Sequence, residues 1–558
     1  MGNGGTDMRH GGQILVDHLK TEGVRRVFSV PGESFLAALD GLHDSGIENV
    51  VCRQEGGAAM MAEAHGKLTG EPGVVFVTRG PGASNAASGI HVAQQDSTPM
   101  VVFVGQIARN HRDREAFQEV DYRAVFGTLA KWSCEVDQTE RLPEYLARAF
   151  HMARSGRPGP VIVALPEDML SAHADVPDRP AMARSNGHVT AGDAQAITAM
   201  LADAKAPLLI AGGPGWSQEA ADNLARFANA HDLPVACAFR RQDFMDNRHP
   251  NYVGDLGVGM NPKLGARLRE ADTLIVVGSR LGDSVTGGYE LLAPAATSKR
   301  IVHIYPDPNE LGRVYHADLA LVATGPEALA ALVQTNGTEA PTWSDWTRSA
   351  RGDYEAFQHP VTTPGDVKME EVVLWLSKNL PEDAIITNGA GNYATWLHRY
   401  FCFKQHGTQL APTSGSMGYG FPAAVAASLE HPDHTVVAWL GDGEFQMTLN
   451  EMSTAIQHGA KPIAIIANNG RYGTIRMHQE RTYPGRVSGT DMANPDFADL
   501  AKAYGGHGET VTNGAEFAEA FARAKAADRL AVIELVLDPQ VATPSLTLDD
   551  LREMGRKG

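Results

Sequence analysis

The sequence has little cysteine and no long hydrophobic run. Its four cysteines, Cys52, Cys134, Cys237 and Cys402, show no CxxC spacing, so we expect neither a disulfide framework nor a cysteine-based metal site. No apolar run reaches the roughly 18 residues that a membrane-spanning helix needs. Residues 1–12 also lack the apolar segment of a secretion signal. We therefore expect a cytoplasmic protein with no membrane partner.

Basic residues are outnumbered as well. The chain has 48 Lys and Arg against 66 Asp and Glu, a net charge of -18. A nucleic-acid-binding surface needs clustered positive charge, so we expect no nucleic-acid partner. The hydrophobic share of 43% and the charged share of 20% are ordinary for a globular protein. These shares leave small molecules as the ligands to consider.

Short β-branched runs alternate with helix-length segments along the chain, which predicts parallel sheets with helices on both faces. Two polar or proline-rich stretches, residues 172–188 and 336–366, separate three blocks. The predicted fold class is α/β, with three doubly wound parallel-sheet domains at residues 8–175, 190–336 and 366–545. The clearest strand candidates are 74–78, 100–105, 161–165, 207–211, 274–278, 301–305, 435–440, 462–467 and 531–536.

The third block carries the strongest motif, Gly441-Asp442-Gly443, which 24 residues separate from Asn468-Asn469. Each half follows a predicted strand, so both lie at the carboxyl edge of the sheet, where ligands bind. Glycines let a phosphate approach the backbone, and the helix N-terminus beyond them attracts an anion. Asp442 and Asn469 offer the hard oxygen ligands that suit Mg²⁺. The pattern therefore predicts a site for a diphosphate and Mg²⁺.

The residues after this motif predict one helix. Phe445, Leu449, Met452 and Ile456 recur at helical spacing and would form one apolar face. Gly459 then ends the helix.

The segment GDGEFQMTLNEMSTAIQHGAKPIAIIANNG resembles the thiamine diphosphate (ThDP) motif of the pyruvate-decarboxylase and acetohydroxyacid-synthase superfamily. The resemblance implies that Asp442, Asn469 and the backbone carbonyl of Arg471 hold Mg²⁺. Met417 would be the apolar wedge that bends the cofactor, although ordinary core packing would also explain this residue. Further cofactor contacts are implied at Gly389, Gly391, Asn392, Tyr393, Gly415, Gly441, Gly443 and Glu444.

The first block offers a carboxylate for the cofactor. Glu55 follows the short apolar run 50–52 and begins an alanine-rich segment, as the activating glutamate of the superfamily does. A surface acid placed for the helix dipole is the alternative. The resemblance also implies cofactor contacts at Pro31, Pro81 and Asn85, since TRGPGASN resembles the superfamily's TSGPGATN. Because the glutamate and the metal site come from different subunits there, a homodimer or homotetramer is implied.

The resemblance covers nearly the whole chain and is greatest to acetohydroxyacid (acetolactate) synthase. GQIARNHRDREAFQEVD aligns without gaps to the segment of that branch that ends in AFQE, which places Phe117 and Gln118 in the active site. Lys131 falls where the branch has a lysine near the substrate entrance. ADTLIVVGSRLGDSVTGG resembles ADLLIAVGVRFDDRVTG, so Arg280 matches the arginine that receives the acceptor's carboxylate. An arginine with no role is the alternative.

Two positions depart from the synthases, and a third distinguishes the chain from pyruvate decarboxylase. Glu33 follows a Pro-Gly turn where pyruvate decarboxylase has an acid used in proton transfer, so it is a candidate second active-site carboxylate. An acid at a helix N-terminus is the alternative for Glu33. His111 stands alone, so the histidine pair of pyruvate decarboxylase is absent. His478 stands where synthases have the tryptophan that selects the acceptor, which predicts a different acceptor pocket.

The sequence leaves FAD open as a further cofactor. Synthases bind FAD in the middle domain, and AGGPG at 211–215 and HIYPDPNELGR at 303–313 keep the general pattern. Arg240-Arg241-Gln242 departs from the synthase loops. Glycine-rich turns of this kind are common between strands and helices.

The resemblance implies three domains, which are pyrimidine-binding, middle and diphosphate-binding. It implies decarboxylation of a 2-oxo acid and transfer of the remaining fragment to a carbonyl acceptor. The alternatives are a 2-oxo acid decarboxylase, an aldehyde lyase and a diketone hydrolase. A non-catalytic ThDP- or nucleotide-binding sensor is a more distant alternative.

Overall fold

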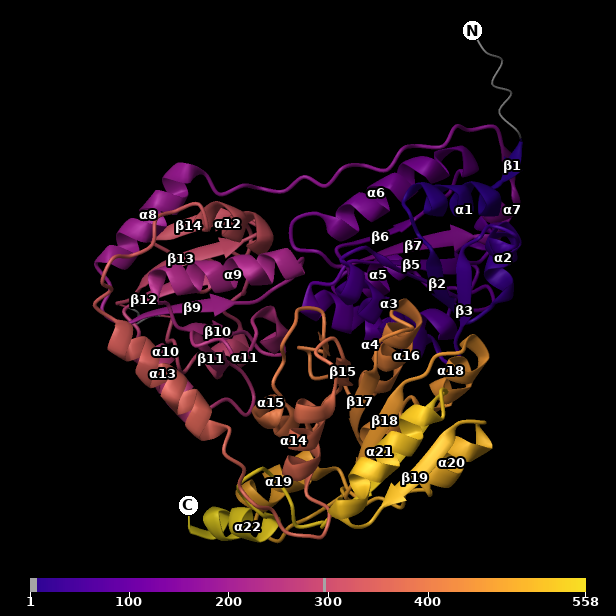
Figure 1. Ribbon diagram of the computed structural model, residues 1–558. Helices are drawn as coiled ribbons and strands as arrows, with labels where there is room; N and C mark the ends of the chain where they lie inside the picture. The colour runs from indigo at the N-terminus through magenta and orange to yellow at the C-terminus, as the bar shows by residue number, and fades with distance from the viewer. Residues whose placement is uncertain (1–7, 295–297, 558) are drawn as a thin grey trace. The chain divides into compact units, whose positions relative to one another are not determined.

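The computed structural model describes residues 8–294 and 298–557. The chain forms three six-stranded sheets flanked by helices, and every paired strand within these sheets runs parallel to its neighbour (Figure 1). The predicted α/β class with three doubly wound sheets is confirmed. No helix in the described part of the chain is both long enough and apolar enough to cross a membrane.

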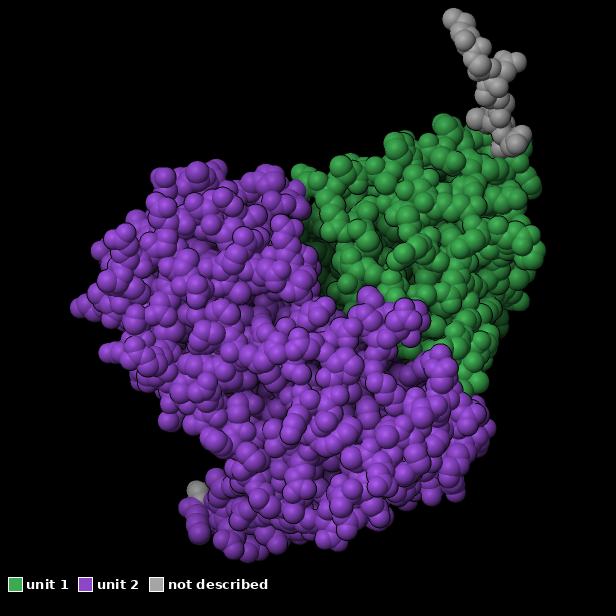
Figure 2. Space-filling model, in the orientation of Figure 1, with its two compact units in different colours: residues 1–185, 425–430, 450–460 green, residues 186–424, 431–449, 461–558 purple. Residues whose placement is uncertain are grey.

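Two compact units contain these sheets (Figure 2). Unit 1 comprises residues 1–185, 425–430 and 450–460. Unit 2 comprises residues 186–424, 431–449 and 461–558. Unit 1 therefore includes two short segments from the third block of the sequence.

The sheet of unit 1 has the order β3-β2-β4-β5-β7-β6. The chain passes from β2 to the edge strand β3 and then continues with β4 on the other side of β2. The winding therefore reverses between β2 and β4, and open α/β sheets bind ligands at the carboxyl ends of the strands at such a reversal. The strands are β2 (Arg26–Ser29), β3 (Glu48–Val51), β4 (Gly73–Val77), β5 (Met100–Gln106), β6 (Trp132–Glu135) and β7 (Pro160–Pro166). The helices are α1 (Gly11–Thr21), α2 (Leu36–Leu42), α3 (Glu55–Thr69), α4 (Pro81–Asp96), α5 (Tyr122–Phe126), α6 (Leu142–Arg154) and α7 (Glu167–Ser171).

The middle sheet lies in unit 2 and has the order β11-β10-β9-β12-β13-β14, so its reversal lies between β9 and β12. Its strands are β9 (Pro207–Ala211), β10 (Val235–Cys237), β11 (Tyr252–Asp255), β12 (Thr273–Val277), β13 (Arg300–Tyr305) and β14 (Leu319–Val322). Its helices are α8 (Ala191–Ala202), α9 (Gln218–His231), α10 (Pro262–Glu270), α11 (Asp283–Thr286) and α12 (Gly325–Leu332).

The third sheet has the order β16-β15-β17-β18-β20-β19, the same winding as the sheet of unit 1, with its reversal between β15 and β17. Its strands are β15 (Ile385–Asn388), β16 (Gln409–Leu410), β17 (Val436–Gly441), β18 (Ile463–Asn468), β19 (His507–Val511) and β20 (Ala531–Val536). The helices of this block include α14 (Met369–Asn379), α15 (Ala394–Tyr400), α16 (Gly420–Glu430), α19 (Gly473–Thr482), α20 (Phe497–Ala503), α21 (Phe517–Ala526) and α22 (Leu548–Lys557).

All nine strand candidates are confirmed, each to within one residue at either end. Continuous apolar runs mark them because both faces of a parallel sheet are covered by helices. β5 illustrates this, since all seven of its residues are buried.

The prediction of one continuous helix from Phe445 to Ile456 is wrong. The segment forms α17 (Asp442–Phe445), the 3₁₀ turn η5 (Leu449–Glu451) and α18 (Met452–His458). The N–H groups of Met447 and Thr448 donate to the carbonyls of Glu444 and Phe445, three residues back, so a tight turn replaces the α-helix here. The Thr448 hydroxyl also donates to the Gly418 carbonyl at 2.8 Å. Gly459 does end α18, with a left-handed φ of 71°.

The second expected linker is also wrong in part, because it contains helix α13 (Ser344–Phe357). Trp343 and Tyr354 are 2% and 7% exposed and belong to the core of the middle sheet. The Trp343 indole donates to the carbonyl oxygens of His231 and Asp232. Polar residues dominate this stretch and hide its narrow apolar face, which Trp343, Ala350 and Tyr354 form.

An ion cluster joins Glu430, the last residue of α16, to the sheet of unit 1. Its carboxylate contacts Arg26 at 2.6 Å, Arg25 at 3.1 Å and His65 at 3.3 Å. The contact with His65, together with the two guanidinium groups, lowers the pKa of Glu430 from 4.5 to about 2 despite its burial.

We predict that Glu430→Gln lowers the free energy of unfolding by about 2 kcal/mol at neutral pH, since charge-assisted bonds are lost. A lowered carboxyl pKa stabilises the fold above its unfolded value of 4.5, and this stabilisation is lost as the pH falls toward 2. Thermal unfolding should therefore show a smaller difference between variant and parent at about pH 3 than at neutral pH. Glu48→Gln, at the more exposed partner of Arg26, should change stability little. An equal Glu430→Gln effect at both pH values would contradict the ion-cluster explanation.

Candidate functional site

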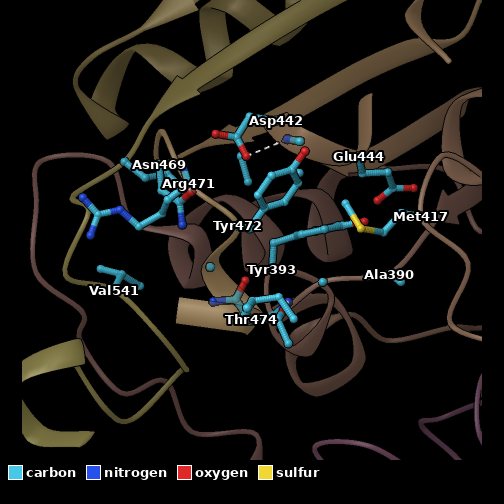
Figure 3. Close-up of a pocket in the computed structure, with 18 of the residues that line it drawn as sticks. Ala390, Tyr393, Met417, Asp442, Glu444, Asn469, Arg471, Tyr472, Thr474 and Val541 are labelled. Carbon is cyan, nitrogen blue, oxygen red and sulfur yellow. Dashed lines mark hydrogen bonds between the residues drawn. The ribbon is translucent and has the colours of Figure 1, made fainter. Parts of the chain in front are cut away.

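A pocket opens at the carboxyl edge of the third sheet (Figure 3). It is lined by loops that follow β15, β17 and β18, so it includes the reversal between β15 and β17. Its polar part is formed by Ala390, Gly391, Asn392, Tyr393, Gly415, Gly441, Asp442, Gly443, Glu444, Asn469, Arg471, Tyr472, Gly473 and Thr474. Its apolar part is formed by Met369, Met417, Ala467, Ile475, Leu537 and Val541.

Asp442 follows β17 directly and is only 3% exposed. Its two carboxylate oxygens accept from the backbone N–H groups of Gly443 at 2.8 Å and Gly470 at 2.9 Å. The amide of Asn494 donates to the same carboxylate at 2.8 Å. Burial raises the pKa of Asp442, because removal from water penalises the charged form. A bound cation would stabilise that charge.

Asn469 and Arg471 line the same pocket just beyond β18. The Asn469 side-chain oxygen accepts from the Arg471 N–H at 3.2 Å, which folds the chain back on itself at this point. Among the described residues, no three His, Cys, Asp or Glu side chains gather as a metal site. A metal in this pocket would therefore need oxygen ligands of other kinds, such as an amide, a backbone carbonyl and a phosphate.

The glycines beside Asp442 have a packing reason in addition to the one we expected from sequence. A Cβ at Gly441 would lie 2.7 Å from the ring of Tyr393, and one at Gly443 would lie 2.8 Å from the ring of Tyr472. The two glycines therefore admit two aromatic rings to the pocket wall. They also leave the backbone uncovered for a ligand.

Glu444 is a buried carboxyl at the same pocket, 2% exposed. One oxygen accepts from the Gly420 N–H at 3.1 Å, and the other has no hydrogen-bond partner among the described residues. Burial raises the pKa of Glu444 to about 8. Gly389 makes room for it, since a Cβ there would lie 1.6 Å from the Glu444 carboxyl.

The pocket combines polar and apolar groups. In Figure 3, Asn469, Arg471 and Val541 lie on one side, Met417 and Glu444 lie on the other, and Asp442 lies between them. Such a pocket suits a ligand with an anionic, metal-binding tail and an aromatic body. The residues present therefore fit ThDP with Mg²⁺.

Unit 1 contains a second buried carboxylate, Glu55, which is the first residue of α3 and 9% exposed. The Asn85 amide donates to one of its oxygens at 3.0 Å. A Cβ at Gly82 would lie 3.1 Å from the other oxygen, so α4 can approach this carboxylate only with glycine there. Pro81, the first residue of α4, begins the helix that carries both Gly82 and Asn85.

Glu33 lies just beyond Pro31 at the carboxyl end of β2 and is 71% exposed in its side chain. The buried guanidinium of Arg79, which follows β4, contacts it at 2.9 Å. Arg79 also contacts Glu167 at 3.1 Å. The ion pair of Glu33 with Arg79 therefore spans the reversal between β2 and β4.

The structure brings one further predicted residue of unit 1 to this region. Gln118 has a left-handed φ of 65°. A Cβ added at Gly80 would lie 2.9 Å from the Cβ of Gln118. Its neighbour Phe117 is 73% exposed. Lys131 is engaged elsewhere, since its ammonium donates to the carbonyl oxygens of Met152 and Ser155 at the end of α6.

Arg280 and His478 do not line the pocket of the third sheet. Arg280 follows β12 of the middle sheet and contacts Glu310 at 3.1 Å. His478 lies on α19, where Arg481 contacts its ring at 2.8 Å. Burial, with the nearby Arg481 charge, lowers the pKa of His478.

Several residues at these sites carry no signal in the sequence. Asn494 lies 52 positions from Asp442 and belongs to no motif. Tyr472 and Thr474 belong to the pocket, and only their closeness to Asn469 could have indicated them. Arg79 stands within the recognised TRGPGASN turn, but the charge pairing that it makes depends on the fold.

Family comparisons agree with this geometry. Residues 9–125, 194–332 and 389–535 match the N-terminal TPP binding domain, the central domain and the C-terminal TPP binding domain of the thiamine pyrophosphate enzymes. The acetolactate synthase isozyme 2 large subunit of Escherichia coli (strain K12) is 34% identical over 90% of this chain and 91% of its own length. The probable acetolactate synthase large subunit of Methanocaldococcus jannaschii is 30% identical over 96% of this chain and 93% of its own length.

Three matched domains cover most of the chain in the order that the sheets show. The identity to the two relatives extends across all three sheets. The chain therefore belongs to the thiamine pyrophosphate enzymes, in the family that includes the acetolactate synthase large subunits.

Proposed function

We propose that the protein uses ThDP and Mg²⁺ to decarboxylate a 2-oxo acid and to join the remaining fragment to a second carbonyl compound. The observation that carries this proposal is the pocket around Asp442, where a desolvated carboxylate, Asn469 and Arg471 lie at the reversal of the third sheet. Relatives named acetolactate synthase, similar over nine-tenths of the chain, support the same reaction class.

In this proposal the Asp442 carboxylate, the Asn469 side chain and the Arg471 carbonyl hold Mg²⁺. The loop from Gly389 through Gly391, Asn392 and Tyr393 faces the diphosphate, together with Gly441, Gly443 and the backbone at Glu444. Gly415 and Met417 face the rings of the cofactor. Every one of these except Gly389 lines the pocket, and Gly389 lies directly behind it against Glu444.

When bound, ThDP would supply a nucleophilic carbon that attacks the carbonyl and a cationic thiazolium ring that accepts the electron pair left when CO₂ departs. We assign to Glu55 the task of holding a proton at the pyrimidine ring nitrogen, which favours the active tautomer. Asn85 fixes its orientation through the 3.0 Å hydrogen bond. Pro31 and Pro81 shape the two loops beside it. Gln118 and Phe117 are proposed to line the substrate space.

A 2-oxo acid decarboxylase is the second candidate, and Glu33 is the observation that favours it. An acid at this turn is able to protonate the fragment that a carboligase would transfer. The contact with Arg79 holds the carboxylate in place, while most of its side chain stays accessible. We propose that the balance between the two outcomes depends on Glu33 and on the acceptor groups Arg280, Lys131 and His478.

For FAD, the middle sheet has the strand order of dinucleotide-binding domains. Its glycine-rich turn is nevertheless explained by packing: a Cβ at Gly213 would lie 1.8 Å from the Gly278 carbonyl. The Trp216 indole donates to the Gly212 carbonyl at 2.8 Å, and Arg280 and Arg313 both contact Glu310. We propose that the reaction does not require a flavin, because packing alone accounts for this glycine-rich turn.

We further propose that the active assembly is a homodimer or homotetramer, in which Glu55 of one subunit serves the cofactor held by Asp442 of another. The four cysteines are free thiols, which supports a reducing compartment such as the cytoplasm.

We predict that the protein with ThDP, Mg²⁺ and pyruvate forms acetolactate as its main product. Glu55→Ala should lower turnover by about 10²-fold, the usual scale for lost proton-transfer help. Product analysis separates acetolactate from acetaldehyde, and acetaldehyde alone would favour the decarboxylase. Unchanged turnover in Glu55→Ala would contradict the role of this carboxylate.

We predict that two inactive variants complement each other. Glu55→Ala and Asp442→Ala chains, co-expressed, should form mixed dimers with one intact site, and random mixing would recover about a quarter of the parent activity. Each variant alone should stay inactive. If Glu55 and Asp442 of the same chain formed the site, the mixture would show no recovery.

We predict that turnover does not respond to added FAD. The visible absorption spectrum of the purified protein reports any flavin already bound, and reconstitution after its removal completes the test. A flavin-free protein that gains activity only when FAD is supplied would contradict this proposal.

A further inference from the structure

We propose that Glu451 is a positioning residue for Glu55, holding the backbone that carries this carboxylate. The inference rests on the proposed role of Glu55 and adds to it a residue of the ThDP motif segment that does not line the pocket. Glu451 ends η5 in the third block of the sequence, and residues 450–460 belong to unit 1 together with Glu55.

The Glu451 carboxylate binds the two residues that precede Glu55. One oxygen accepts from the backbone N–H groups of Arg53 at 3.2 Å and Gln54 at 3.0 Å. The other accepts from the Arg53 N–H at 3.2 Å and the Thr454 hydroxyl at 2.5 Å. Glu451 is 0% exposed, so no water replaces these bonds if they are lost.

Neighbours of Glu451 hold the same stretch of chain. The His458 ring accepts from the Val51 N–H at 2.9 Å, and the Gln457 side chain accepts from the Arg53 guanidinium. The Thr454 hydroxyl lies 3.5 Å from the Val51 carbonyl. Helix α18 therefore fixes the path between β3 and α3 from end to end.

The start of α3 is shaped to receive Glu451. A Cβ at Gly57 would lie 2.6 Å from a Glu451 oxygen, so only glycine permits this approach. The Gln54 side chain caps α3 by accepting from the Gly57 N–H at 3.0 Å. Glu55 is therefore the first residue of a helix whose N-terminus is held by Glu451 on one side and by the Gln54 cap on the other.

The carboxylate form suits this position because its oxygens accept five hydrogen bonds, the fifth from the Asn450 amide at 3.4 Å, and donate none. An amide at residue 451 would present N–H groups to backbone N–H groups and would break part of the network. Misplacement of a catalytic group by about 1 Å can cost about 10²-fold in rate. Glu451 should therefore act on the rate through Glu55 and leave substrate binding largely unchanged.

Glu451→Gln tests the proposal. We expect kcat to fall at least about tenfold, with a similar fall in the rate of C2 proton exchange of bound ThDP and a change of less than about threefold in KM. In a Glu55→Ala background the same substitution should cost no more than about twofold, because both changes remove one function. Full additivity of the two losses would overturn the inference.

Hydrogen exchange on cofactor-free protein gives an independent readout. Glu451→Gln should expose the amides of Arg53 and Gln54 to exchange, without global loss of protection. Unchanged protection at both amides would overturn the inference. If Glu55→Ala itself leaves proton exchange unaffected, the proposed function has failed and not the positioning role alone.

Glu63→Gln is the matched control. Glu63 is also 0% exposed and lies on α3, where its carboxylate accepts from the Thr98 hydroxyl at 2.6 Å and contacts the Lys67 ammonium at 3.1 Å. It should lower thermal stability while leaving C2 proton exchange near the parent rate. Equal losses of exchange rate in Glu63→Gln and Glu451→Gln would reduce Glu451 to a general stability role and overturn the proposal.

Discussion

The candidate pocket depends on one tie between neighbouring strands. The Asp442 carboxylate accepts from the backbone just after β17 and from Gly470 just after β18, so a single buried side chain fixes the spacing of two strand ends. Asn494 completes this arrangement by donating to both Asp442 and Asn468. The group that we propose as a metal ligand is therefore also the group that shapes the site.

Carboxylates with backbone partners recur at both sites. Glu451 binds two N–H groups before α3, as Asp442 binds two N–H groups beside β17 and β18. Burial raises the pKa of both, while hydrogen bonds to the charged form oppose this shift. Rigid backbone donors of this kind need no reorganisation during a reaction, which is how enzymes prepare charge stabilisation in advance.

The sequence was sufficient for nine of the eighteen strands of the three sheets and for the main motif. Apolar runs marked these nine strands, and the positions of Asp442 and Asn469 after two of them indicated a shared edge. Contacts between distant segments left no such signal: Glu451 lies about 400 positions from the backbone that it binds, and Asn494 belongs to no motif. Helix α13 was missed because polar residues surround its apolar face, and periodicity does not report the tight turn before α18, in which N–H groups bond to carbonyls three residues back.

The sheet of unit 1 and the third sheet share one winding order. In each sheet the strand order reverses between the same two strand positions. The loops at one sheet carry Glu33 and Arg79, while those at the other carry Asp442 and Asn469. The strand order therefore does not determine the chemistry, which depends on the residues of the connecting loops. Loops exchanged between such sheets would carry their reactivity with them, so new substrate ranges can arise in this architecture without redesign of a core.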